Sequence, residues 1–351
     1  MNSLREIDFS NKSKFLYLQS FHGNLENNYI FGGTQPVMTQ SDRDFILVYG
    51  DAFVDFIAKD YTNTEFVTYL GGATINVAAG ISRIGAPSAL ITITGDDETS
   101  EFVRNEIAKE GVNLQYSIFD PAKRVSGVYV HLTENCERIF KDYIDETPDL
   151  QVTADQLDEQ AFKRASVLNV CSGTMFHETA LETTRRAVEL AKDNGVIVAI
   201  DANIRPLRWP SEDVCRETIS SFFEEADILK LTDEELFFLT ETTTLEDGIA
   251  ALNDLLVPIV LITVGADGAY AVLNGETMHV PVEKVEPVDT TGAGDAFMSG
   301  VLRYVHYNSL PTTEEELMKC VSFGNELGAR AATKPGALTA LPHYDEIKHL
   351  L

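Results

Sequence analysis

The stretch SVLNVCSGTMFHETALETTRRAVELAKDNGVIVAID, residues 166–201, contains the signals of a strand, a helix and a second strand in succession. Its ends, 166–170 and 196–201, are short apolar runs with the length of buried strands. The segment between them places its apolar residues roughly on one helical face, and Gly195 is typical of a helix end. Two strands joined by one helix predict a parallel pair with a crossover connection.

The same alternation extends outward in both directions. We expect a helix over 100–109 and another in TDEELFFLT at 232–240, which has a polar cap and an acidic first turn. Strands alternating with helices predict an α/β fold with a mostly parallel central sheet covered on both faces. The further apolar runs that we interpret as strands are FILVYG (45–50), ALITITG (89–95), ADILKL (226–231) and PIVLITVG (258–265).

Two segments interrupt this rhythm. Residues 53–70 and 127–144 alternate in hydrophobicity like antiparallel strands, and the second has a turn signal at Glu134–Asn135. Such inserts form either a small β-strand lid over a site or an antiparallel edge of the main sheet. An unpaired strand edge invites a partner, so we also predict a homodimer joined through these strands.

Composition narrows the classes of function. The chain has 351 residues, and its 27 Lys and Arg against 55 Asp and Glu give a net charge of −28. Hydrophobic residues make up 44%, enough for a folded core. The negative charge argues against binding nucleic acid or an anionic membrane, although a local pocket can still hold a small anion. No apolar run is long enough to predict a transmembrane helix.

The cysteines and the N-terminus point to a cytoplasmic protein. Cys136, Cys171, Cys215 and Cys320 form no CxxC pair, which favours reduced thiols. The opening residues have no apolar core like that of a signal peptide. Residues 1–45 are rich in Asn, Ser, Gln and Phe, and we interpret them as an extension of unknown role before a main domain at 46–351.

The sharpest local signal is DTTGAGDAFMSGVLRYV, 289–305. The small residues Gly292, Ala293 and Gly294 precede a helix, where bare N–H groups and the helix dipole attract an anion. Asp295 follows in the first turn. It either caps the helix or acts as a general base beside the anion. The chain contains no Walker A loop, and Phe297 rules out a GxGxxG pattern here.

A second glycine motif, GGATINVAAGISRIG, spans 71–85. Gly71 and Gly72 would allow a polyhydroxylated ligand to approach the backbone, with Asn76 as donor and acceptor to its hydroxyls. The alternative is a packed turn with a solvated Asn76. A third motif, ITVGADGAYAV at 262–272, is by itself typical of an ordinary turn.

Together, the motifs at 71–85 and 289–300 resemble the two signatures of the ribokinase-like (PfkB) carbohydrate kinases, and the resemblance covers about residues 46–351. DANIRPLRWP (201–210) and ILKLTDEELFFLT (228–240) are most similar to the fructokinase branch. The resemblance implies a three-layer α/β/α fold with a small β-strand lid. It also implies an ATP-dependent transfer of a phosphoryl group to a sugar hydroxyl, with Mg²⁺ as cofactor and fructose as the best match.

The resemblance assigns roles to residues by position. Asp295 matches the catalytic base, and Gly292, Ala293 and Gly294 match the anion hole. The residues expected at the sugar are Asp55, Gly71, Gly72, Asn76 and Arg205. The residues expected on the ATP side are Lys230, Thr232, Thr263, Gly265, Gly268 and Asn325. The residues expected at metals are Glu235, which would organise Mg²⁺ through water, and Asp289 and Thr291, which would bind a monovalent cation such as K⁺.

The sequence departs from the family pattern at two positions. Thr232 replaces the asparagine of the N-x-x-E motif, and Ser100 stands where a glycine is usual. The substrate also stays open at this stage. Arg205 could pair with the carboxylate of 2-keto-3-deoxygluconate, which with another ketose or a riboside is the alternative to fructose. A non-catalytic, kinase-like regulator would be expected to lack the base or the anion-hole glycines, and this chain has both.

Overall fold

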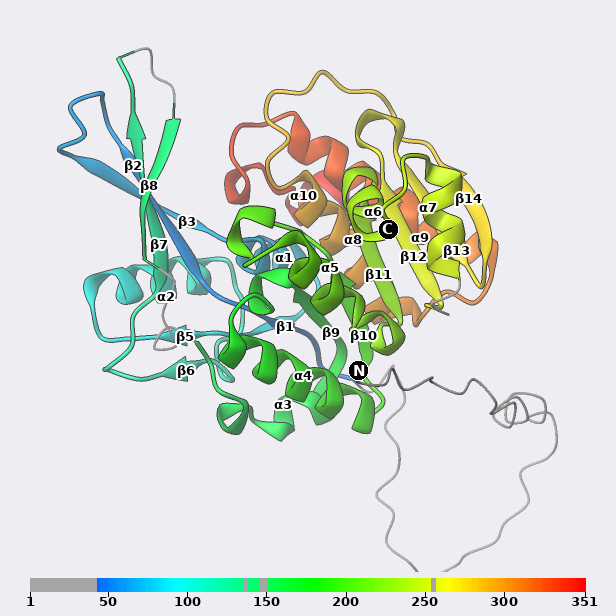
Figure 1. The fold of residues 1–351 in the computed structure, drawn as a ribbon, viewed down its shortest axis with the longest axis horizontal. Coiled ribbons are helices and arrows are strands. Elements are labelled where there is room, and N and C mark those ends of the chain that lie inside the picture. Colours follow the sequence, from blue (N-terminus) through cyan, green and yellow to red (C-terminus); the bar gives the residue numbers. More distant parts are fainter. Residues whose placement is uncertain (1–42, 135–137, 145–150, 254–256) are drawn as a thin grey trace, which may run out of the picture. The chain divides into compact units, whose positions relative to one another are not determined.

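The computed structural model describes residues 43–134, 138–144, 151–253 and 257–351 (Figure 1). Nearly all of the predicted extension at 1–45 lies outside the described residues, and so does Asn135 of the predicted turn. Within the described residues, no helix combines the length and apolar character needed to cross a membrane.

An eight-stranded main sheet forms the centre of the fold, in the order β14-β13-β12-β11-β10-β9-β1-β4. The six strands from β4 to β12 in this order pair in parallel, and β13 and β14 continue the sheet antiparallel. The strands are β1 Phe45–Tyr49, β4 Ser88–Ile91, β9 Ala165–Cys171, β10 Ile197–Asp201, β11 Ile228–Thr232, β12 Ile259–Thr263, β13 Ala269–Leu273 and β14 Glu276–Val280.

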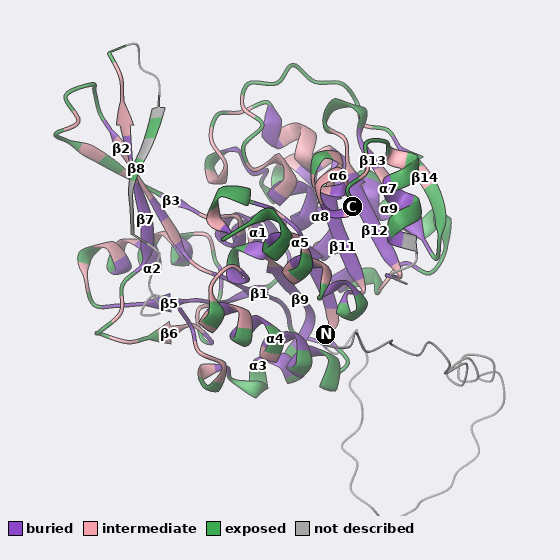
Figure 2. Ribbon diagram, viewed as in Figure 1, coloured by how far each residue is buried: buried purple, intermediate pink, exposed green. Residues whose placement is uncertain are grey.

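Strand periodicity sends alternate side chains to two separate cores. In β1, Phe45, Leu47 and Tyr49 join one core, whereas Ile46 and Val48 join the other. Figure 2 shows these central strands as buried along their length. The helices that contribute to the first core are α3 Glu159–Arg164, α4 Glu178–Asp193, α5 Glu212–Ser220, α6 Asp233–Thr240 and α7 Leu245–Asn253. Those of the second core are α1 Ala73–Arg83, α2 Glu98–Lys109, α8 Ala293–Asn308, α9 Glu314–Ala332 and α10 Tyr344–Ile347.

The two predicted inserts form one separate sheet, which we call the lid sheet. It consists of β2 Phe53–Ala58, β3 Phe66–Gly71, β7 Ser126–Leu132 and β8 Arg138–Ile144, in the order β3-β2-β7-β8. Each insert is an antiparallel hairpin, and β2 joins β7 in parallel. The hairpins project away from the main sheet in Figure 1. The inserts therefore form a sheet of their own, and the alternative of an antiparallel edge on the main sheet is wrong.

The predicted strand at 89–95 is divided, and the helix after it begins early. β4 ends at Ile91 and the short strand β5 covers Ile93–Thr94, paired with β6 at Ile118–Phe119. Between β4 and β5, the hydroxyl of Thr92 accepts a 3.0 Å hydrogen bond from the Ala52 amide. The helix starts at Glu98 instead of Ser100, because Asp97 caps it. Ser100 is buried and its hydroxyl accepts from the Gly95 amide at 2.9 Å, so it braces this loop.

Candidate active site

A cleft of about 1070 Å³ opens at the carboxyl ends of the parallel strands. Residues that follow β1, β9 and β10 line it, among them Asp51, Ser172 and Asn203. The lid sheet contributes Ile57, Tyr69 and other side chains to the same cleft. Parallel α/β sheets bind ligands at this edge, because strand ends and helix N-termini converge there.

Most of the residues singled out from the sequence meet in this cleft. The lining includes Asp55, Gly71, Gly72, Asn76, Arg205, Lys230, Thr232, Glu235, Asp289, Thr291, Gly292, Gly294 and Asp295. They come from both ends of the chain, so the fold brings together motifs that lie more than 200 residues apart in sequence, as the 219-residue separation of Asn76 and Asp295 illustrates.

Five of the predicted residues do not line the cleft. Four of them belong to the ATP assignment: Thr263, Gly265, Gly268 and Asn325. Asn325 is buried and donates to the Val280 carbonyl at 2.8 Å, and Gly268 packs so closely that a Cβ would lie 2.3 Å from the same carbonyl oxygen. Ala293 is the fifth, and its amide donates to the Thr290 carbonyl. The structure thus gives Gly268 and Asn325 local packing contacts, whereas nothing lies within 4 Å of a Cβ added to Gly265.

Asp295 lies at the floor of the cleft and does not cap its helix. The N-cap of α8 is Gly292, and no side chain caps this end. The Asp295 carboxylate instead accepts a 2.8 Å hydrogen bond from Asn76 Nδ2. Both residues are buried, so the alternative of a solvated Asn76 is wrong. Burial raises the pKa of Asp295 above its ordinary value, although Asn76 and the nearby Lys230 and Arg205 cations oppose that rise.

The uncapped start of α8 is shaped for close approach by an anion. Gly292 has φ +79°, a left-handed conformation that favours glycine, and a Cβ there would lie 2.9 Å from the Ala337 Cα. Without a side-chain cap, the first turn of this 16-residue helix keeps its positive end directed at the cleft. The ammonium of Lys230 lies beside the same turn, 3.2 Å from the position that a Gly294 Cβ would occupy.

A carboxylate accompanies Lys230 below the cleft surface. Asp201 and Lys230 are register partners on β10 and β11, and Lys230 Nζ lies 3.1 Å from Asp201 Oδ1. Burial raises the pKa of Asp201 above its ordinary value, and the ammonium of Lys230 opposes that rise. The Lys230 pKa, which burial alone would lower, is raised by the carboxylates of Asp201 and Glu235.

Comparison with known proteins identifies the family. The model of the pfkB family of carbohydrate kinases matches residues 43–343. The chain belongs to this family. Fructokinase from Klebsiella pneumoniae is 36% identical to this kinase over 307 residues, covering 87% of this chain and 99% of the relative. Fructokinase-1 from Zea mays is 33% identical and covers 88% of this chain and 98% of its own.

Solved structures of carbohydrate kinases share the fold. A fructokinase double mutant from Vibrio cholerae O395, solved with fructose, ADP and potassium ion bound, superposes with a TM-score of 0.78 at 30% identity, covering 88% of this kinase and 99% of that chain. Aminoimidazole riboside kinase from Salmonella enterica, solved with aminoimidazole riboside and an ATP analogue, gives a TM-score of 0.75 at 26% identity. The match covers 87% of this kinase and 99% of that chain. The predicted ribokinase-like fold is confirmed.

The lid side of the kinase cleft contains residues that sequence reasoning missed. Asp51 lines the cleft directly after β1, and its position at the carboxyl end of a buried strand was a usable signal. A Cβ on Gly71 would lie 3.1 Å from an Asp55 carboxylate oxygen, so the glycine makes room for that side chain. Tyr69 reaches the same cleft from β3.

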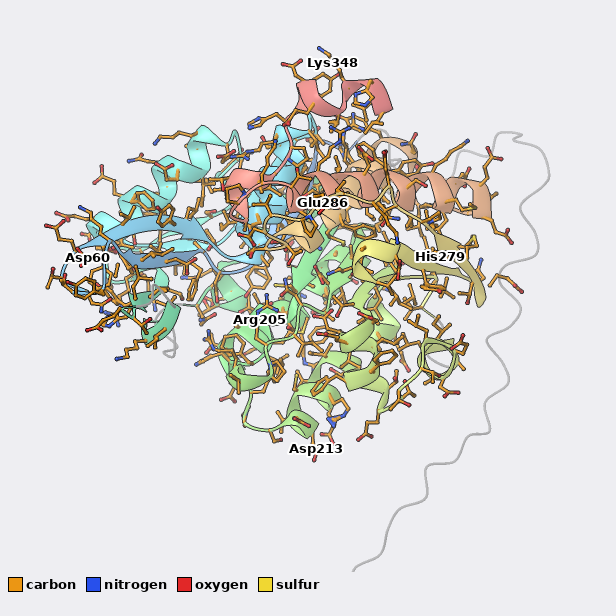
Figure 3. All side chains as sticks on the ribbon, turned by 90° about the horizontal axis from the view of Figure 1, so that it is seen from above. Asp60, Arg205, Asp213, His279, Glu286 and Lys348 are labelled. Carbon is orange, nitrogen blue, oxygen red and sulfur yellow. The ribbon has the colours of Figure 1, made fainter. Side chains whose placement is uncertain are left out.

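The opposite wall of the kinase cleft follows β10. Arg205 lies on this segment (Figure 3) and donates to the carbonyl of Ile204 at 3.0 Å. Arg208 also lines the cleft, with its guanidinium 4.5 Å from the centre of the Phe176 ring. Sequence reasoning did not single out either residue: Arg208 lies in the DANIRPLRWP segment but was assigned no role there, and Phe176 meets it only through the fold.

The two predicted metal positions have protein partners. Glu235 accepts from the Ile204 amide at 2.7 Å and from the Thr232 amide at 2.8 Å, and Thr232 completes a capping box for α6. Thr232 can therefore replace asparagine because a hydroxyl suffices as a cap. One carboxylate oxygen of Asp289 accepts from the Thr291 amide and hydroxyl, and the other accepts from the Gly336 amide.

Proposed function

We propose that this kinase transfers the γ-phosphoryl group of ATP to a hydroxyl of fructose. The observation that carries the proposal is the meeting of a buried carboxylate, Asp295, with the open N-terminus of α8 in one cleft. Asp51, Asp55 and Asn76 supply polar groups on the sugar side of that cleft. Relatives and structural neighbours named as fructokinases support fructose over other sugars.

In the proposed mechanism, the sugar hydroxyl lies between Asp295 and the γ-phosphorus. Asp295 accepts the hydroxyl proton as the sugar oxygen forms its bond to phosphorus, and the bond from phosphorus to the bridging oxygen of ADP breaks. Asn76 holds the Asp295 carboxylate in place through the 2.8 Å hydrogen bond. The amides of Gly292 and Gly294, which line the cleft, and the Lys230 ammonium stabilise the charge that gathers on the phosphoryl oxygens.

The residues present fit a magnesium ion held mainly by phosphates and water. Within the described residues, no group of three or more His, Cys, Asp or Glu side chains is placed to hold a metal. Mg²⁺ in phosphoryl-transfer sites keeps several waters and uses one or two carboxylates, so Glu235 at the cleft suits that role. When bound, the ion would neutralise phosphate charge.

We further propose that K⁺ activates the enzyme through Asp289. This carboxylate ties the turn before α8 to the Gly336 amide, so a cation there would order the anion-hole backbone. The rate in K⁺ should exceed the rate in tetramethylammonium at equal ionic strength and constant MgATP. Equal rates would remove the cation from the proposal.

We propose a cytoplasmic homodimer joined through the lid sheet. The three cysteines that the structure describes, Cys171, Cys215 and Cys320, are free thiols, as a reducing compartment favours. Val67, Tyr69 and Ile139 of the lid sheet are exposed apolar side chains that a partner would cover. A monomer mass in sedimentation at micromolar concentration would contradict the dimer.

A sugar acid such as 2-keto-3-deoxygluconate is a second candidate substrate. The two arginines of the cleft, Arg205 and Arg208, favour it because a guanidinium binds carboxylate well. Steady-state kinetics with MgATP and a panel of about ten ketoses, ribosides and sugar acids tests both candidates. The highest kcat/KM on fructose supports the proposal, and a sugar acid at the top of the panel replaces it.

Replacement of Asp55 by Ala should weaken binding of the sugar. A carboxylate at this position accepts hydrogen bonds from sugar hydroxyls, and losing such charge-assisted bonds costs about 1.5–3 kcal/mol each. The KM for the preferred sugar should therefore rise by roughly 10-fold or more, with the KM for ATP unchanged. If the KM for ATP rises and the KM for the sugar does not, Asp55 does not bind the sugar and its assignment is wrong.

A further inference from the structure

The Asp201–Lys230 pair is more deeply buried than a cleft residue needs to be. Its side chains are 3% and 4% exposed, and Lys230 Nζ contacts both Asp201 carboxylate oxygens, at 3.1 and 3.3 Å. Lys230 lines the cleft, whereas Asp201 does not. The carboxylate therefore lies behind the ammonium, on the side away from the ligand.

The burial of this ion pair is not explained by a gain in the stability of the fold. Removing two charges from water costs several kcal/mol each, and buried ion pairs can often be replaced by apolar residues of similar volume without loss of stability. A buried lysine without a counterion tends to lose its proton. The carboxylate of Asp201 therefore keeps Lys230 charged at a position where its ammonium also lies beside the start of α8.

Other charged groups compete for the same ammonium. The carboxylates of Glu235 and Asp295 also attract Lys230, and Lys230 in turn lowers the pKa of Asp295. If Lys230 moved onto Asp295, it would occupy the base that must accept the sugar proton. The hydrogen bond from Asp201 on β10 holds the Lys230 ammonium in the position where that ammonium lies beside Gly294.

We propose that Asp201 is a positioning residue that holds the Lys230 ammonium against the phosphoryl-binding turn at Gly294. This inference rests on the proposed kinase function. It assigns Asp201 to the phosphate side of the reaction, with no contact to the sugar. Replacing the carboxylate should therefore affect the use of ATP selectively.

The test is steady-state kinetics of Asp201→Asn, Lys230→Met and the double variant, with ATP and the sugar varied separately. Asp201→Asn should lower kcat/KM for ATP about 10- to 100-fold, the usual effect of losing a supporting partner behind a functional group, and leave the sugar KM unchanged. The double variant should be no worse than Lys230→Met, because Asp201 acts only through Lys230. Asp201→Glu keeps the buried charge pair, so it should fold and show a smaller loss in the same direction.

Asp227→Asn is the matched control. Asp227 precedes β11 at the opposite end of the same strand pair, where its carboxylate accepts from the Val198 amide at 2.8 Å. It should alter thermal stability without changing the ATP parameters. Equal ATP-selective losses in Asp227→Asn and Asp201→Asn would overturn the proposal, and so would full recovery of Asp201→Asn at raised Mg²⁺. A wild-type protein that phosphorylates no sugar would instead refute the kinase function itself.

Discussion

Asp295→Asn should retain the fold and sugar binding but lose about 10²–10⁴-fold in kcat, the usual contribution of a general base. The amide has the shape of the carboxylate, and its oxygen can still accept the hydrogen bond that Asn76 Nδ2 donates. What disappears is the group that takes the proton from the attacking hydroxyl. Single-turnover measurements at saturating sugar and ATP would measure the loss directly.

The pH profile gives this prediction a second readout. The base must be deprotonated to act, so wild-type kcat should fall as the pH is lowered through the pKa of Asp295. Because burial raises that pKa, the fall should begin at a higher pH than for an ordinary aspartate. The residual activity of the variant should not show this decrease at acidic pH. Asp97→Asn is a suitable control, since Asp97 caps α2 and does not line the cleft. Near-wild-type kcat in Asp295→Asn would exclude Asp295 as the base.

Gly292→Ala should lower kcat by about 10²–10³-fold, comparable to the loss of a donor from an oxyanion hole. Two effects add at this position. The backbone has φ +79°, which alanine adopts poorly, and the new methyl group would lie 2.9 Å from the Ala337 Cα. The turn must therefore shift, and its amides no longer meet the phosphate.

Gly275→Ala is a control that separates the effect of backbone strain at a positive φ from the effect of a steric clash with a neighbouring residue. Gly275 also has a left-handed φ of +90°, in the turn between β13 and β14, but nothing lies within 4 Å of its added Cβ. This control should lose some stability and keep its kcat. If both alanine variants lost the same activity, backbone strain alone would explain Gly292→Ala, and the anion-hole assignment would fail.

The strands and layers of the fold were predictable because they depend on local patterns. FILVYG and PIVLITVG are apolar runs of strand length, and they form β1 and β12 close to the predicted limits. The division at Thr92 was not predictable, since it accompanies contacts with distant segments: β4 pairs with β1, β5 pairs with β6, and the Thr92 hydroxyl accepts from the Ala52 amide. Sequence prediction also omitted α9, although the fold buries it against the second core.

The site was predictable where a glycine motif marks a backbone approach. Gly292 and Gly71 both lie in the cleft, and both are glycine for reasons of space that the structure makes visible. Arg208 and Phe176 follow no glycine motif, and their contact becomes visible only when the fold brings the two side chains together. For Asn325, the structure shows a buried side chain that donates to the Val280 carbonyl, and its assignment to the ATP side stays a prediction.

The hydrogen bond between Asn76 and Asp295 joins residues that are 219 positions apart. During translation at about 5–20 residues per second, the ribosome therefore needs roughly 10–45 s to deliver Asp295 after Asn76. Throughout that interval the apolar residues of α1, among them Ile75 and Ile81, lack the α8 surface that buries them in the finished protein. The reactive centre is thus one of the last parts of the nascent chain to form, and no fragment ending before α8 can possess it.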